Sequence, residues 1–122
     1  MNDISRIDCN ERRSRVVIYN GMVFVGGQTS DNKDLDIGGQ TREALRKVDI
    51  YLAEAGTDKS RLLSAQIWLK NIERDFHGMN EVWDAWTAPG ASPARATAQC
   101  SMAKPGTLVE ILVTAAAPAA AR

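Results

Sequence analysis

The hydrophobic positions of the chain recur with two different periods, which separate predicted strands from predicted helices. Two β-rich runs, 15–19 and 22–26, flank Asn20-Gly21, the dipeptide that best tolerates the positive φ angles of a two-residue hairpin turn. Residues 4–9 can add a short strand before them. Residues 62–70 alternate with period two and predict a further strand. This part of the chain therefore predicts a hairpin and two more strands.

Two other segments carry apolar residues at helical spacing. The first runs from about residue 37 to residue 55, and Gly56 follows it as a C-terminal stop signal. The second runs from about 75 to 86 and is ended by Pro89-Gly90. Its predicted apolar stripe consists of Phe76, Met79, Val82, Trp83 and Trp86. Both segments are expected to form amphipathic helices.

The last two strands, about 94–101 and 107–115, are joined through Lys104-Pro105-Gly106, a typical turn sequence. The predicted order is therefore ββ(β)αβαββ, in a single domain of residues 1–117 with a frayed tail at 118–122. Two helices can cover only one face of such a sheet. The sequence thus predicts an α+β sandwich with one face of its sheet uncovered.

Alternation along the last two strands suggests which residues share a face. The small residues are expected to face the helices; they are Ala94, Ala96, Ala98 and Cys100. The uncovered face is expected to carry Arg95, Thr97 and Gln99, together with Leu108, Glu110, Leu112 and Thr114. If the two strands pair, Arg95 and Glu110 share one surface. A partly apolar, uncovered face with an Arg and a Glu favours self-association.

Composition narrows the classes of partner. The 122-residue chain has 15 basic and 15 acidic residues and no basic stripe, so neither nucleic acid nor a membrane surface is an expected partner. The N-terminal residues lack the apolar run of a signal peptide, which predicts a cytoplasmic protein. Cys9 and Cys100 are expected to be free thiols. His77 is the single histidine, and no Cys or His pair has the spacing of metal ligands, so no metal site is expected.

Three segments carry a resemblance to a known family. Pro93-Ala94-Arg95-Ala96-Thr97, followed by Leu108-Val109-Glu110-Ile111, resembles the C-terminal signature of the Rid (reactive intermediate deaminase, YjgF-like) family. Gly26-Gly27-Gln28 resembles the Ser-Gly-Gln segment of that family, and residues 80–86 are similar to its YoaB-like branch. The resemblance implies a chorismate-mutase-like fold with a six-stranded mixed sheet and two helices on one face. It also implies a homotrimeric barrel with three pockets between subunits, and no cofactor.

The resemblance further implies a reaction, the hydrolytic deamination of reactive 2-imino or enamine acids to 2-keto acids and ammonia. Arg95 corresponds to the arginine that binds the substrate carboxylate, and Glu110 to the glutamate that positions water or supplies a proton. Backbone at Gly27 and the side chain of Asn80 would complete the pocket. Thr97 stands in place of a frequent cysteine, and the pocket tyrosine falls near Arg12 or Arg13, where an added arginine would favour a second acidic group on the substrate.

Simpler interpretations remain open for these residues. Arg95 could form a surface or interface salt bridge, and Glu110 could pair with a lysine across the trimer. Asn80 could be a helix-surface amide, and Arg12 and Arg13 a solvated basic turn. The whole protein could also be a non-catalytic trimeric module that binds small carboxylates or docks on a partner. Ribonuclease activity has little support in a neutral chain without a His or Lys cluster.

Overall fold

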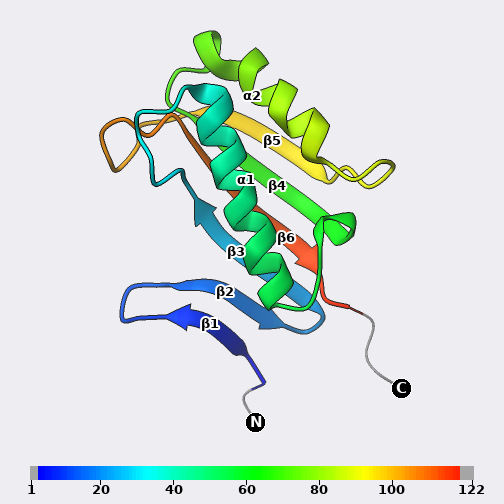
Figure 1. Ribbon diagram of the computed structural model, residues 1–122. Coiled ribbons are helices and arrows are strands. Elements are labelled where there is room, and N and C mark those ends of the chain that lie inside the picture. The colour runs from blue at the N-terminus through cyan, green and yellow to red at the C-terminus, as the bar shows by residue number, and fades with distance from the viewer. Residues whose placement is uncertain (1–2, 119–122) are drawn as a thin grey trace.

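The computed structural model describes residues 3–118 and contains six strands, two α-helices and one short 3₁₀ helix (Figure 1). Local signals in the sequence account for most of their boundaries. The predicted tail at 118–122 lies outside the described residues except for Pro118. The elements in chain order are β1 (Ser5–Cys9), β2 (Ser14–Tyr19), β3 (Met22–Gln28), α1 (Ile37–Glu54), η1 (Lys59–Arg61), β4 (Leu62–Leu69), α2 (Ile72–Trp86), β5 (Ala94–Gln99) and β6 (Val109–Ala116).

The predicted hairpin is confirmed as the β2–β3 pair. Tyr19 lies opposite Met22, and the two residues between them have positive φ angles, 52° at Asn20 and 78° at Gly21. Both angles suit the two central positions of a type I′ turn, whose twist matches that of the paired strands. The turn dipeptide therefore sets the register of the first half of the sheet.

The six strands form one mixed sheet in the order β1-β2-β3-β6-β4-β5. All neighbouring strands are antiparallel except β4 and β5, which are parallel and are connected through α2. Both helices lie on the same side of the sheet, as Figure 1 shows. The predicted α+β sandwich, with its six-stranded mixed sheet and two helices on one face, is confirmed.

The core fills the space between this face and the helices. Alternate positions of the strands and one stripe of each helix are buried there. The buried apolar side chains are Val16, Val23, Val25, Ala44, Leu45, Val48, Leu52, Leu62, Ala65, Ile67, Leu69, Met79, Trp83, Val109, Ile111, Val113 and Ala115. The alternation on β6 therefore places Glu110 on the other face of the sheet, the face without helices.

The second helix begins three residues earlier than predicted, at Ile72. Asn71 is its N-cap, and the side-chain oxygen of Asn71 accepts a hydrogen bond of 3.0 Å from the backbone N–H of Arg74. Phe76 was expected on the buried stripe but is 40% exposed. The inward position is taken by the preceding residue, Asp75, and a neighbouring helical residue points about 100° away from it.

The last two strands do not pair with each other, which corrects the expectation that Arg95 and Glu110 share one surface. β4 lies between β5 and β6, and Arg95 is in register with Ala65, a buried residue on the helix side. The alternation grouped the residues of β5 correctly but assigned the two groups to the wrong faces. Residues Ala94, Ala96 and Ala98 are exposed on the side without helices, whereas Arg95, Thr97 and Gln99 face the α2 side.

The face without helices keeps a partly apolar surface. Tyr19, Met22 and Phe24 are 47%, 36% and 42% exposed on or beside it. Phe24 is in register with Thr114 of β6, next to the half-buried Leu112. In the described part of the chain, no helix packs over these residues (Figure 1).

Candidate functional site

Arg95 lies on the edge strand β5 and reaches the flank of α2. Its Nη1 donates a hydrogen bond of 2.8 Å to Oδ1 of Asn80, and its guanidinium carbon is 5.5 Å from the centre of the Trp83 ring. Asn80 and Trp83 are three residues apart on α2 and so share one side of that helix. A cation above an aromatic face is attracted by the ring electrons. The guanidinium is therefore held in place by an amide and a ring.

No carboxylate within residues 3–118 pairs with Arg95, which is exposed. The structural salt bridge that was an open alternative for this arginine is thus not formed within the described chain. Thr97 follows two positions along the same face, and its Oγ1 is buried without a hydrogen-bond partner among the described residues. Such a buried hydroxyl commonly has a partner, either protein or solvent. We call Arg95, Asn80 and Thr97 the Arg95 half-site.

Glu110 and Gly27 form a second arrangement on the other face of the sheet. A Cβ atom built on Gly27 would lie 2.9 Å from Cδ of Glu110 and closer still to its Oε2, so a larger residue cannot fit without moving the carboxylate. The β3–β6 register shifts between Val25 and Gln28, which marks a bulge at this point. In the described part of the chain, the carboxylate of Glu110 has no hydrogen bond and no ion pair.

A hollow of about 260 Å³ opens beside this carboxylate. It is lined by Arg15, Gly27, Thr29, Asp31, Lys47, Ala103, Lys104, Thr107 and Glu110. We call this hollow, with Gly27 and Glu110, the Glu110 half-site.

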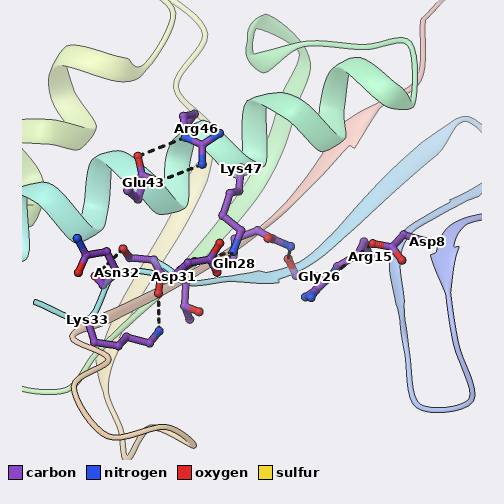
Figure 2. A network of polar contacts seen from close by, with 12 residues as sticks. Asp8, Arg15, Gly26, Gln28, Asp31, Asn32, Lys33, Glu43, Arg46 and Lys47 are labelled. Carbon is purple, nitrogen blue, oxygen red and sulfur yellow. Dashed lines mark hydrogen bonds and ion pairs between the residues drawn. The ribbon is translucent and has the colours of Figure 1, made fainter. Parts of the chain in front are cut away.

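Polar contacts fix several side chains around the Glu110 half-site (Figure 2). Lys47 reaches from α1 and donates to the backbone oxygen of Thr29 at 2.9 Å and to Oδ1 of Asp31 at 3.0 Å. The hydrogen bond and the charge of Lys47 lower the pKa of Asp31. Arg15 approaches Asp8, with 3.8 Å between Nε and Oδ2, yet that Nε is buried without a hydrogen-bond partner among the described residues.

A buried glutamine holds the two loops beside this hollow together. The side-chain amide of Gln40, which is fully buried, donates to the backbone oxygens of Leu35 at 3.1 Å and Gly106 at 2.9 Å. Its oxygen accepts from the backbone N–H of Leu108 at 2.9 Å. Gln40 therefore ties the loop before α1 to the turn that precedes Glu110.

The predicted site residues thus fall into two groups on opposite faces of the sheet. Asn80, Thr97 and Arg95 come together on one face, and Gly27 and Glu110 on the other. Arg13 joins neither group, because it lies in the turn between β1 and β2, and its Nη1 donates to the backbone oxygen of Asp8 in β1 at 2.9 Å. Sequence reasoning missed Arg15, although alternation around the buried Val16 was a signal that Arg15 faces the same side as Glu110.

Other features of the molecule lie apart from these two groups. A hollow of about 430 Å³ between α1 and α2 contains none of the predicted site residues. His77 is exposed and pairs with Glu81 at 2.8 Å, one helical turn away. Among residues 3–118, no three His, Cys, Asp or Glu side chains are grouped so that they could hold a metal ion. Neither helix of the described chain has the length and apolar character needed to cross a bilayer.

Comparison with known proteins now identifies the family. The chain is 43% identical over 113 residues to a RutC family protein of Haemophilus ducreyi, an alignment that covers 93% of this chain and 96% of that protein. It is 40% identical over 113 residues to the RutC family protein YoaB of Escherichia coli, with 93% and 97% of the two chains covered.

Solved structures of YjgF family proteins have the same fold as this chain. A YjgF family protein of Neisseria meningitidis, NMB1025, superposes with a TM-score of 0.92 at 39% identity, over 97% of this chain and 98% of that one. Rv2704 of Mycobacterium tuberculosis, of the YjgF/YER057c/UK114 family, gives a TM-score of 0.77 at 31% identity, with 85% and 86% covered. The family model described as Endoribonuclease L-PSP matches residues 4–117, and the chain therefore belongs to this family, the YjgF/Rid family.

Proposed function

We propose that this protein hydrolyses 2-imino acids, and the enamines that tautomerise to them, to 2-keto acids and ammonia. The observation that carries the proposal is the state of Arg95. Its guanidinium is oriented by Asn80 and Trp83 and pairs with no carboxylate of the described chain. A planar, permanently charged group prepared in this way is suited to a bidentate contact with a substrate carboxylate.

Glu110 supplies the acid–base chemistry in this proposal. Water adds to the carbon of the C=N bond while the carboxylate of Glu110 accepts a proton from that water. The same proton then passes to the nitrogen, which gives a carbinolamine. A second proton moves through Glu110 from the new hydroxyl group to the nitrogen, the C–N bond breaks, and ammonia leaves as the carbonyl forms. The close approach of Gly27 to Glu110 supports this role, because it leaves the carboxylate accessible beside bare backbone. An imine is already electrophilic, so positioning contributes much of the acceleration.

The active unit that we propose is a homotrimer with its pockets between subunits. The two half-sites lie on opposite faces of one sheet, and a small imino acid cannot bridge them within a single chain. Arg95 lies on an edge strand, so it can extend beyond its own sheet toward a neighbouring copy. The partly apolar face around Phe24 and Leu112 offers the surface for association. Arg95 of one subunit would then meet Gly27 and Glu110 of the next.

A coupled assay tests the reaction. An amino-acid oxidase generates 2-imino acids in situ, and semicarbazide traps those that escape hydrolysis, so an active protein lowers the rate of semicarbazone formation. We expect Arg95→Ala to remain folded and to lose hydrolysis by about a hundredfold or more, since it removes a charge-assisted bidentate contact. Arg95→Lys is expected to be poor as well, because a single ammonium cannot reproduce the planar contact.

Two results would count against this proposal in different ways. Full turnover by Arg95→Ala would remove the arginine from the reaction. Binding of 2-keto acids that depends on Arg95, without any turnover by the native protein, would instead favour a non-catalytic carboxylate-binding module.

A further inference from the structure

The Glu110 half-site carries more positive charge than the proposed hydrolysis requires. Three cations line the hollow, on Arg15, Lys47 and Lys104, against the carboxylates of Asp31 and Glu110. Asp31 is already paired with Lys47 at 3.0 Å. Arg15 and Lys104 therefore face a hollow whose one remaining carboxylate is that of Glu110.

Neither of these two cations is fully neutralised by the chain. The side chain of Lys104 forms no hydrogen bond and no ion pair within residues 3–118. Arg15 is 3.8 Å from Asp8, and its buried Nε has no hydrogen-bond partner in the same part of the chain. The Arg15 side chain as a whole is 34% exposed, so part of it stays open to a ligand in the hollow despite the contact with Asp8.

A third lysine adds to this excess of positive charge. Lys33 packs against Gly106 in the turn that carries Lys104, with 2.9 Å between its Cβ and the position of a Cβ on Gly106. Burial and the charge of Lys104 lower the pKa of Lys33, and the charge of Glu110 opposes that shift. The charges of Lys104, Asp31, Lys47 and Glu110 all act on Lys33, so this group holds three positive charges and two negative charges.

We propose that Arg15 and Lys104 bind a second carboxylate at the far end of the substrate, so that the preferred substrates are 2-imino dicarboxylic acids. This inference rests on the proposed function. Arg95 of the neighbouring subunit takes the carboxylate next to the imine, Glu110 stands at the imine carbon, and the acidic side chain extends toward Arg15 and Lys104. The hollow of about 260 Å³ suits a small metabolite rather than a drug-sized or nucleotide ligand.

The test compares an acidic with a neutral substrate in the oxidase-coupled assay. We expect the native protein to show a higher kcat/KM for the imine of glutamate than for the imine of 2-aminobutanoate. Lys104→Gln should lower the ratio of the two kcat/KM values about fivefold, the effect of losing one partly screened charge, and Arg15→Gln should lower it similarly. Lys104→Arg keeps the charge and should keep the ratio.

Arg46→Gln is the matched control. It removes one positive charge from α1, next to Lys47 in sequence, but Arg46 faces solvent and pairs with Glu43 at 3.0 Å outside the hollow. The ratio of the two kcat/KM values in Arg46→Gln should equal that of the native protein. A native preference for the neutral imine, or a ratio that is unchanged in both Lys104→Gln and Arg15→Gln, would overturn the inference.

A binding measurement separates failure of this inference from failure of the proposed function. Calorimetry with 2-oxoglutarate and 2-oxobutanoate, the corresponding keto acids, requires no turnover. Tighter binding of the dicarboxylate that weakens about fivefold in Lys104→Gln supports the second-carboxylate site even in a protein that hydrolyses no imine. Equal binding of the two acids contradicts it even in an active enzyme.

Discussion

Oδ1 of Asn80 accepts a hydrogen bond of 2.8 Å from Nη1 of Arg95, which joins the middle of α2 to the edge strand β5. The bond leaves the far side of the guanidinium unpaired within the described chain. In the function that we propose, Asn80 is therefore a positioning residue for Arg95. The amide of Asn80 is neutral, which matters because a carboxylate at this position would pair with the guanidinium of Arg95. That guanidinium is the group that we propose binds the substrate carboxylate.

Substitutions at Asn80 should separate orientation of Arg95 from its charge. Asn80→Ala removes the acceptor, and we expect KM for 2-imino acids to rise about fivefold, the effect of about 1 kcal/mol from one partly exposed hydrogen bond. Asn80→Asp keeps an acceptor but pairs the guanidinium, so KM should rise more than in Asn80→Ala. Steady-state kinetics measures KM for both variants and checks which of the two is higher. The melting temperature, Tm, should change little in either variant. A lower KM in Asn80→Asp than in Asn80→Ala would contradict the role of an unpaired charge.

Gly27 and Glu110 should act as a coupled pair. In Gly27→Ala the new methyl group collides only with the flexible side chain of Glu110, so we expect the fold to be kept and the carboxylate to be displaced. The rate of hydrolysis, kcat, should therefore fall about as far as in Glu110→Ala. The double variant should be no worse than Glu110→Ala alone, because both changes remove the same group. Fully additive losses in kcat would show that Gly27 serves another purpose.

Local chemistry in the sequence predicted some elements well. Asn20-Gly21 specified the hairpin because the two residues themselves tolerate positive φ, and the C-terminal stop at Gly56, with φ of 80°, ended α1 for the same reason. Non-local placements could not be read in this way. The proximity of Gly27 to Glu110 depends on the pairing of β3 with β6 and on a bulge between Val25 and Gln28.

The two faces of β5 illustrate the limit of period-two alternation. The pattern separated Arg95 from Ala94 and Ala96, but an alanine fits equally well against a helix or in an exposed position. The register with β4 places Arg95 on the α2 side, where it contacts the amide of Asn80 and the ring of Trp83. Such a partner becomes apparent only when the crossover from β4 to β5 is placed in space.

The face without helices should mediate assembly, and two phenylalanines allow a matched test. Phe24 is 42% exposed on that face, and Phe76 is 40% exposed on α2 on the other side of the molecule. Light scattering should give about three times the 13.3 kDa chain mass for the native protein and for Phe76→Asp. Phe24→Asp should give a much smaller particle, because a buried unpaired carboxylate is costly at an interface. A native monomer, or a trimer that survives in Phe24→Asp, would contradict assembly through this face.

The two half-sites should complement each other between subunits. Arg95→Ala and Glu110→Ala are each expected to be nearly inactive, since every site in either homotrimer lacks one group. If the two variants are unfolded together in equal amounts and refolded, random assembly places an intact Arg95 opposite an intact Glu110 in about a quarter of the sites. Hydrolysis should therefore recover to about a quarter of the native rate, whereas mixing the already folded variants without subunit exchange should recover none. A site built within one chain would gain nothing from mixed assembly, because each chain would still lack either Arg95 or Glu110. Recovery thus requires that Arg95 and Glu110, which lie on opposite faces of one sheet, meet only across a subunit boundary.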